Sequence, residues 1–312
     1  MRRLVVSAFA KVNLGLEVLG LRSDGTHELR TLFQTIDLAD RIVLAARPRA
    51  MKLRCDDPSL PVDEGNLALR AAHQLRRYAG VRRGVEISLE KRIPVAGGLG
   101  GGSSDAAAVL MGLDRLWDLG LGRRGLLPLA RRLGADVPFF LWGGTALGIG
   151  RGDEIYPLAL RIRGHLVVVE GGRPLSTATV FAHVDRSLTP RENSNTIFRF
   201  ISGCGEKGSA ALSVLSNDLE PVALEVAPDL EPRVRKVREL LQRCGARLAA
   251  LSGSGASYFG FFDRAADAAR AAQLLRREGI GASCARALSG ERYRAAWDRS
   301  LKRRTARAGW SR

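Results

Sequence analysis

The stretch that decides the fold reads Pro94-Val95-Ala96-Gly97-Gly98-Leu99-Gly100-Gly101-Gly102-Ser103-Ser104-Asp105. It holds five glycines within six positions. Glycine carries no Cβ, so this backbone can approach a bound group closely. The Ser-Ser-Asp at its end is typical of residues that open a helix, whose free N–H groups favour anions. The stretch is therefore predicted to cradle phosphate.

The residues on either side support this prediction. Upstream, apolar and polar residues alternate over 85–90, which is typical of a half-buried strand. Downstream, apolar residues recur at helical spacing from Ser104 to Trp117. A flexible glycine linker would lack such flanks, so we favour a structured loop between a strand and a helix.

The common phosphate-binding motifs do not fit the loop. A Walker loop ends in Gly-Lys-Ser/Thr, whereas the first lysine after these glycines is Lys207. A dinucleotide fingerprint spaced from Gly98 and Gly100 would need glycine or alanine where Ser103 stands. The loop therefore belongs to another kind of phosphate site.

Length and composition limit the class of protein. The chain has 312 residues, 46% of them hydrophobic, which is enough for two domains. Its four cysteines stand singly, without the spacing of a zinc site or a disulfide framework. Nowhere do about 18 apolar residues run together. We expect a cytoplasmic protein that does not span a membrane.

The charge is strongly basic and uneven. The net charge is +17, and residues 286–312 hold nine basic residues against two acidic ones, or +7 of that total. A basic tail can attract nucleic acid, but no aromatic residues interleave with a basic groove here. We therefore expect residues 289–312 to be a solvated basic tail, with no nucleic-acid partner. The expected oligomeric state is a monomer or a weak homodimer.

The pattern along the chain predicts an α+β protein of two domains, with a boundary at residues 160 and 161 and the second domain ending at 288. Strands are expected over 4–18, 29–46, 51–55, 85–93, 165–169, 247–251 and 257–262. Helices are expected over 67–79, 104–117, 126–133, after Ser176-Thr177, between Asp229 and Gly245, and over 265–277. After Leu288 the chain is expected to fray.

Several polar residues could serve chemistry or structure. Lys11 and Asn13 share one face of an otherwise apolar strand, where a lysine needs a carboxylate, a phosphate or water, or else protects an exposed edge. Asp136, followed by Pro138, is typical of a helix cap, and a cap can also act as a base. The stretch 22–28, which contains His27, and the turn 252–255 are typical of plain turns.

Taken in order, five segments resemble the motif series of the GHMP kinases: Ala10-Lys11-Val12-Asn13-Leu14, Asp24-Gly25-Thr26-His27, the glycine loop, Gly134-Ala135-Asp136-Val137-Pro138 and Leu251-Ser252-Gly253-Ser254-Gly255. The resemblance spans roughly residues 7–262. It implies a two-domain α+β kinase with its active site in the cleft between the domains. It also implies transfer of the γ-phosphate of ATP to the 2-hydroxyl of the erythritol part of a cytidyl-linked sugar alcohol, a step of isoprenoid precursor biosynthesis.

The resemblance implies roles for individual residues. The loop at 94–104 would bind the ATP phosphates, and Asn66 would lie near the adenine. Asp136 would take the proton from the attacking hydroxyl, while Lys11 would keep Asp136 ionised and steady the developing charge. Mg²⁺ would arrive with ATP and could touch Ser103 or Ser104, since no dedicated cluster of metal ligands is visible.

On the acceptor side, the resemblance implies that Asn13 and His27 contact the substrate, with His27 at the cytosine edge. Thr177 and Phe181 match a stretch that stacks on the nucleotide. Thr26 departs from the family, which has a tyrosine there; about 1–3 kcal/mol of base stacking is lost without another ring. Two alternatives stay open: a GHMP kinase for a sugar, homoserine or a mevalonate-type alcohol, and a basic nucleic-acid-binding protein.

Overall fold

The computed structural model describes residues 2–187 and 195–302. Its elements, in chain order, are β1 (Arg3–Leu21), β2 (His27–Arg47), β3 (Met51–Cys55), α1 (Leu67–Tyr78), β4 (Gly84–Glu90), α2 (Gly101–Trp117), α3 (Gly122–Leu133), α4 (Val137–Trp142), β5 (Thr145–Gly150), β6 (Glu154–Pro157), β7 (His165–Val169), α5 (Thr177–Ser187), α6 (Thr196–Lys207), η1 (Gly208–Val214), α7 (Leu219–Val226), η2 (Pro228–Leu230), α8 (Glu231–Arg243), β8 (Leu248–Leu251), β9 (Tyr258–Phe262), α9 (Ala265–Arg277), β10 (Ala282–Arg286) and α10 (Gly290–Lys302).

The first sheet is built around one long hairpin. β1 pairs antiparallel with β2 over most of its length. The two halves of β2 take different second neighbours, because residues 41–47 pair with β4 and residues 29–34 pair with β5. β3 runs parallel to β4, with α1 as the crossover helix between them. The sheet order is β3-β4-β2-β5-β6, with β1 on β2.

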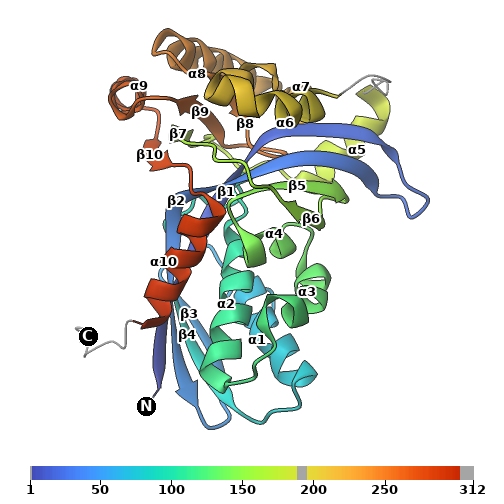
Figure 1. Cartoon of the computed structure of the whole chain (residues 1–312), viewed down its shortest axis with the longest axis vertical. Coiled ribbons are helices and arrows are strands. Elements are labelled where there is room, and N and C mark those ends of the chain that lie inside the picture. The colour runs from blue at the N-terminus through green and yellow to red at the C-terminus, as the bar shows by residue number, and fades with distance from the viewer. Residues whose placement is uncertain (1, 188–194, 303–312) are drawn as a thin grey trace.

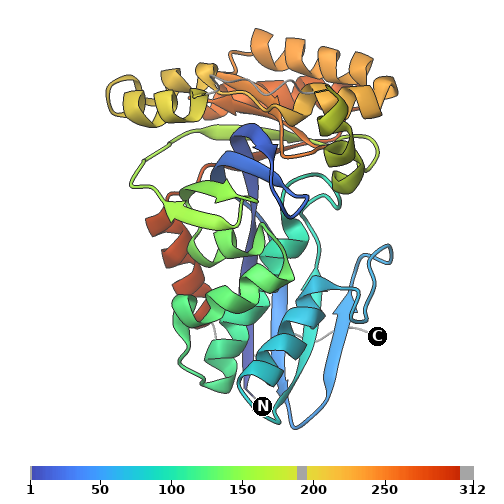
Figure 2. The ribbon, with the colours of Figure 1, turned by 90° about the vertical axis from the view of Figure 1, so that its right-hand side faces the viewer.

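Helices cover one face of this sheet (Figures 1 and 2). α1 begins at Asn66, whose Oδ1 accepts a hydrogen bond of 3.0 Å from the backbone N–H of Ala68. Its apolar stripe packs on the alanine-rich α2, and α2 packs in turn on β1 and β2. The result is a first hydrophobic core beneath the glycine loop.

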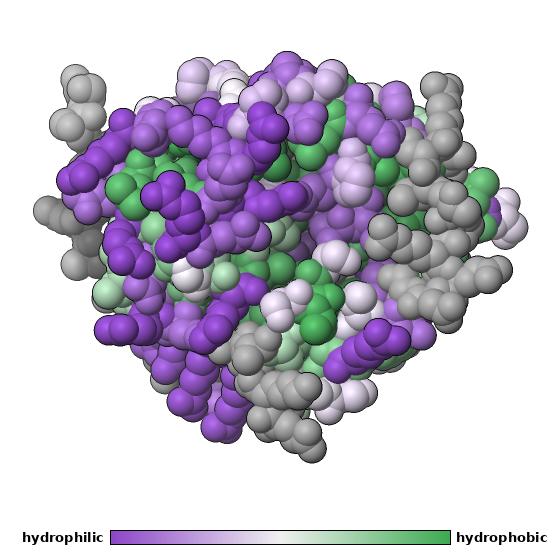
Figure 3. All heavy atoms as spheres, turned by 90° about the horizontal axis from the view of Figure 1, so that it is seen from above, coloured by the Kyte–Doolittle hydropathy of each residue, from purple (hydrophilic) through white to green (hydrophobic). Residues whose placement is uncertain are grey.

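The second sheet is antiparallel, with the order β10-β7-β9-β8. α8 and α9 pack on it and form the top of the molecule in Figure 1. Seen from above, most of that face is hydrophilic, with apolar residues showing between the charged ones (Figure 3). The expected boundary at residues 160 and 161 lies in the connection between β6 and β7.

A further core joins the two sheets. It combines Val12 and Leu32 of the hairpin with Val168, Phe259 and Phe261 of the second sheet. Each sheet and the helices packed on it form one layer of the molecule, and the hairpin belongs to both layers. One end of the hairpin carries the first sheet, and the other end lies under the second (Figure 1). A strand fixed in this way holds its side chains at the junction of the two layers.

Two expectations from the sequence need correction. The helix expected from Ser104 begins at Gly101, because Gly100 adopts a left-handed conformation (φ 70°) that turns the chain into the helix three residues earlier. The expected fraying after Leu288 is wrong as far as Lys302, since residues 290–302 form α10.

α10 is held by two aromatic side chains on one face. Tyr293 and Trp297, one helical turn apart, are buried in the first core, and the ring of Tyr293 lies 5.6 Å from that of Phe9. The Tyr293 hydroxyl donates to the backbone carbonyl of Phe140. The last described helix therefore returns to the first sheet, and residues 303–312 of the expected basic tail lie outside the described residues.

Candidate active site

Two adjoining cavities lie where the glycine loop meets the second layer. One, of about 380 Å³, is lined by the glycine loop and Asn66. The other, of about 270 Å³, is lined by Lys11, Asn13 and Phe181 among others. The residues that line both are Gly98, Ser103, Asp136 and Thr177. Asp136 thus stands at the boundary between the two cavities, where a group could pass from one to the other.

The glycines of the loop are required partly by packing. A Cβ on Gly98, which has a φ of 71°, would lie 2.0 Å from the backbone oxygen of Ser252. A Cβ on Gly97 would lie 2.2 Å from Ser257 Oγ. Gly102, by contrast, is exposed, and its nearest neighbour would be 3.6 Å away. The first two glycines therefore admit the turn of the second sheet, and Gly102 leaves the start of α2 open to a ligand.

Hydrogen bonds fasten this turn to the loop. Ser252 Oγ donates to the carbonyl of Gly98 at 2.9 Å, and the Ser257 N–H donates to the carbonyl of Gly97 at 3.1 Å. The side-chain amide of Asn217 holds the turn from behind by donating to the carbonyls of Leu251 and Gly253. The turn that sequence reasoning took for a plain one is a wall of the site.

Lys11 lies at the centre of the site and is 3% exposed. Its Nζ donates to Asn13 Oδ1 at 2.6 Å and forms an ion pair with Asp136 Oδ2 at 3.4 Å. The ring of Phe33 lies 5.5 Å below the ammonium group. Asn13 is fixed in turn by donating to Thr31 Oγ1 at 2.8 Å. Because Lys11 is buried and paired, the alternative of an exposed edge-strand lysine is wrong.

Asp136 occupies the position before α4 without acting as a cap. Its side chain makes no capping hydrogen bond, although Pro138 stands in the first turn as expected. One third of the side chain is exposed, and Oδ2 faces Lys11. Asp136 is thus a carboxylate that does not cap its helix, is paired with a buried lysine and lines both cavities.

Phe181 lines the second cavity, and His27 packs against it although the two residues are distant in sequence. Their ring centroids are 5.2 Å apart, with an angle of 36° between the planes. Thr177 Oγ1 lies 2.8 Å from Ser254 Oγ. Thr26 does not join them, because its N–H and hydroxyl both donate to Asp24 Oδ1.

Two other predicted residues serve the structure. Asn66 caps α1 and lines the cavity of the glycine loop, so its side chain is already engaged. Ser104 is buried, and its hydroxyl donates to the carbonyl of Phe9 at 2.7 Å. Ser103, which lines both cavities, is therefore the serine of this pair that could reach a ligand.

Sequence reasoning missed four residues of the site: Thr31, Phe33, Arg151 and Asn217. Thr31 and Phe33 are two residues apart on β2; Thr31 is hydrogen-bonded to Asn13, and Phe33 lies against the ammonium group of Lys11. The hairpin pairing could have indicated them, because side chains at alternate positions share one face. Nothing in the sequence marks Arg151 or Asn217.

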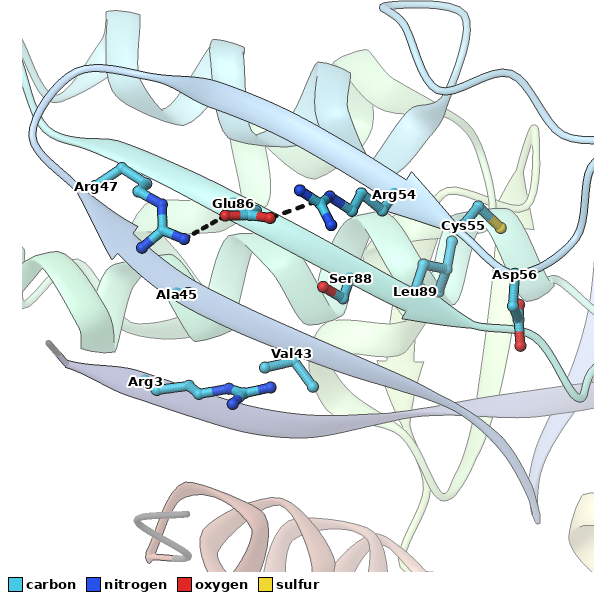
Figure 4. A pocket seen from close by; sticks show the side chains of 10 residues that line it. All are labelled: Arg3, Val43, Ala45, Arg47, Arg54, Cys55, Asp56, Glu86, Ser88 and Leu89. Carbon is cyan, nitrogen blue, oxygen red and sulfur yellow. Dashed lines mark hydrogen bonds and ion pairs between the residues drawn. The ribbon is translucent and has the colours of Figure 1, made fainter. Parts of the chain in front are cut away.

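A third cavity, of about 540 Å³, lies on the first sheet and shares no lining residue with the other two. Figure 4 shows its side chains, which come from β1 to β4 and the residue after β3. Arg47 and Arg54 both bind Glu86 there. The cavity is therefore not part of the site around Lys11.

Two other features are absent from the part of the chain that the structure describes. Within residues 2–187 and 195–302, no three or more histidine, cysteine or acidic side chains gather as metal ligands would. Over the same ranges, no helix has the length and apolar character needed to cross a membrane.

Comparison with protein families identifies the class. Residues 66–144 match the GHMP kinases N terminal domain, and residues 205–281 match the GHMP kinases C terminal domain. Together with the two-layer fold and the glycine loop, these matches define the class: the chain belongs to the GHMP kinases, and its predicted α+β fold of that type is confirmed. It is a kinase that uses ATP.

Full-length relatives narrow the class. The 4-diphosphocytidyl-2-C-methyl-D-erythritol kinase of Gloeobacter violaceus is 40% identical over 288 residues, covering 90% of this chain and 93% of the relative. That of Chlorobium limicola is 42% identical over 282 residues, covering 89% and 95%. A crystal structure of 4-(cytidine 5'-diphospho)-2C-methyl-D-erythritol kinase superposes with a TM-score of 0.73 at 39% identity, covering 91% and 98%. Within the GHMP kinases, the chain belongs to this kinase family.

Proposed function

We propose that the chain transfers the γ-phosphate of ATP to the 2-hydroxyl of 4-diphosphocytidyl-2-C-methyl-D-erythritol, for isoprenoid precursors. The observation that carries this proposal is the Lys11–Asp136 pair, which stands where a glycine-loop cavity meets a second, ring-lined cavity. The names of the relatives supply the identity of the acceptor.

In the proposed reaction, ATP lies against the glycine loop with its phosphates at the start of α2. Phosphoryl transfer needs mainly alignment and charge neutralisation, which backbone N–H groups and a lysine can supply. Asp136 accepts the proton of the attacking hydroxyl as the oxygen–phosphorus bond forms and the bond to ADP breaks. Lys11 holds that carboxylate at 3.4 Å and offsets charge on the transferred group.

Mg²⁺ would come with ATP and neutralise charge on the phosphate oxygens. Ser103 fits such an ion, because it lines both cavities and can supply a hydroxyl oxygen. The Ser104 hydroxyl is engaged by Phe9. We therefore propose Ser103, rather than Ser104, as the residue that approaches the ion.

The acceptor would lie along the second cavity. His27 and Phe181 offer two rings for the cytosine in place of the tyrosine that Thr26 replaces. Asn13, beside Lys11, would position the hydroxyl. Arg151 lines the same cavity and brings a positive charge suited to a diphosphate.

A panel of acceptors tests the proposal. Steady-state rates with ATP should give a kcat/KM for the cytidyl-linked substrate at least about 10²-fold above those for mevalonate, homoserine and simple sugars, since those lack the base and the diphosphate. Phe181→Ala should raise the KM for the acceptor and leave that for ATP unchanged. A higher kcat/KM for mevalonate or homoserine would instead favour another GHMP kinase activity.

A further inference from the structure

The third cavity (Figure 4) lies on the face of the first sheet that points away from α1 and α2. Side chains alternate along a strand, so Ile42 and Leu44 of β2 pack into the first core, and Val43 and Ala45 lie on the other face. The volume of about 540 Å³ is typical of a small-molecule site and exceeds that of either cavity around Asp136. The proposed phosphoryl transfer makes no use of it.

The strand register explains why this face is hollow. Arg3 of β1 is paired with Ala45 of β2, and Ala45 is paired with Glu86 of β4. In the next row on the same face, Ser88 of β4 is paired with Arg54 of β3. The short side chains of Ala45 and Ser88 thus lie on the two middle strands, and the outer strands carry the two arginines. The face forms a bowl with short side chains on its floor and guanidinium groups on its rim.

The charges on the rim are unequal. Arg47, at the end of β2, and Arg54 both pair with Glu86, so one carboxylate serves two guanidinium groups (Figure 4). Asp56, the other acidic residue that lines the cavity, has Oδ1 engaged by a backbone N–H at 2.9 Å. Together with Arg3, three arginines face two carboxylates, which leaves a net charge of +1 on the cavity. This charge favours an anion.

Arg3 provides a second, independent sign of a ligand. Its Nε is buried and has no hydrogen-bond partner among the described residues, although Arg3 lines the cavity. In Figure 4 its side chain runs along β1 toward Val43. A buried donor without an acceptor is costly, and native structures usually supply one. The planar guanidinium group matches the oxygens of a phosphate, sulfonate or carboxylate.

The floor of the bowl adds an apolar surface to this charge. Val43, Ala45 and Leu89 line the cavity beside the arginines. An inorganic anion would leave that floor in contact with water, and a neutral apolar molecule would leave Arg3 without an acceptor. A ligand that meets both requirements has an apolar body and one anionic group.

We propose that this cavity binds a small amphipathic anion, with its apolar body on Val43 and Ala45 and its phosphate, sulfonate or carboxylate group on Arg3. The two arginines held by Glu86 add positive charge around the anion. The cavity shares no lining residue with the two cavities around Lys11. The inference is therefore independent of the proposed phosphoryl transfer.

Calorimetric titration of the whole protein with hexyl phosphate, which joins a phosphate to a short apolar chain, tests the proposal. The wild type should bind it at a single saturable site, and saturating MgADP should not displace it. Hexanol and inorganic phosphate each carry one half of this chemistry, so each should bind at least about tenfold more weakly.

Two variants locate the site. Arg3→Gln removes the guanidinium group and Ala45→Phe fills the floor, so each should weaken the binding of hexyl phosphate by about tenfold or more. Arg235→Gln, at an exposed position of α8 in the second layer, is the matched control for charge and should keep the wild-type affinity. Urea unfolding checks that each variant is folded, and where one is not, the other decides.

Three results would overturn the proposal. One is a failure of hexyl phosphate to saturate the wild type. Another is wild-type affinity in a folded Arg3→Gln or Ala45→Phe. The third is displacement of hexyl phosphate by MgADP, because that would put the bound phosphate at the glycine loop and not on the outer face of the first sheet.

Discussion

At the scale of single residues, the site depends on which partner each charged group has. Asp136 stands where a helix cap would stand, and its side chain turns to Lys11 instead. Lys11 in turn is fixed by Asn13, which is fixed by Thr31. A chain of bonds from β2 through β1 therefore sets the position of the carboxylate that is proposed to take the proton.

The first prediction concerns that carboxylate. Asp136→Asn keeps the shape of the side chain and removes its basicity, so kcat should fall by about 10²–10⁴. Nucleotide affinity, measured by calorimetry with MgADP, should change little because the glycine loop is untouched. Asp263→Asn, in an ion pair with Arg247 on the second layer, is the control and should keep the wild-type rate. An unchanged kcat in Asp136→Asn would exclude this residue as the base.

The second prediction concerns the pH dependence of folding. Since burial raises the pKa of Asp105 from 3.8 to about 7, the folded chain holds a proton between these values that the unfolded chain has released. Its contribution to stability is therefore complete below pH 3.8 and is lost as pH rises to about 7, at about 1.4 kcal/mol per pH unit. Asp105→Asn should lack this loss.

Urea unfolding of both proteins from pH 5 to pH 8 measures the effect. As pH rises from 5 to about 7, the unfolding free energy of the wild type should fall by up to about 3 kcal/mol relative to that of Asp105→Asn. Above pH 7 the difference between the two proteins should stay constant. Other carboxylates cancel in the comparison because both proteins contain them. A difference that stays constant over this range would show that Asp105 titrates at an ordinary carboxyl pKa.

Some of these residues could be predicted from the sequence and others could not, and the difference has a physical cause. Lys11 and Asn13 could be found because alternation within one strand puts them on the same face. Asp105 was taken only as part of a helix opening, since its partner Lys91 follows β4, and Asp40, the other partner of Lys91, lies on β2. Local patterns report which residues share an element and say nothing of which elements meet.

At the scale of elements, the glycine loop and the turn between β8 and β9 form one unit. The loop approaches the turn so closely that the backbone of Ser252 occupies the place of a Cβ on Gly98. From the sequence we predicted that the loop cradles phosphate, and we attributed all its glycines to that bound group. Packing against the turn explains Gly97 and Gly98 as well, and this contact joins parts of the chain that are far apart in sequence.

The third prediction follows from this contact. Gly98→Ala should displace the loop, because its φ of 71° disfavours alanine and the added Cβ would meet Ser252. The affinity for MgADP should fall by about tenfold or more, which corresponds to about 1–3 kcal/mol of strain. Gly203→Ala, in α6 and outside both cavities, where an added Cβ would meet nothing within 4 Å, is the matched control. Calorimetric titration of both variants makes the comparison, and a Gly98→Ala variant with wild-type affinity would contradict it.

At the scale of the whole molecule, the C-terminal helix α10 packs back against the first sheet. The β1–β2 hairpin passes through both layers, and α10 returns from the second layer to the first. The sequence predicted fraying after Leu288 and a solvated basic tail at residues 289–312, and nine basic residues dominate residues 286–312. The spacing of Tyr293 and Trp297, one turn apart, was the signal of a buried face, and it is the stronger guide because burial depends on a few large apolar side chains.

The last prediction follows from the packing of α10 on the first core. Trp297→Ala removes a buried ring from the first core and should lower the unfolding free energy by about 3–5 kcal/mol, whereas Arg292→Ala on the exposed side of α10 should change it by less than about 0.5 kcal/mol. Because the core around Val12 and Phe259 joins the layers, the loss should reach the second sheet as well. Hydrogen exchange during urea unfolding of Trp297→Ala should show β4 and β9 losing protection at the same midpoint. Loss of protection in β4 at a lower urea concentration than in β9 would mean that the two layers unfold separately and that the shared core does not couple them.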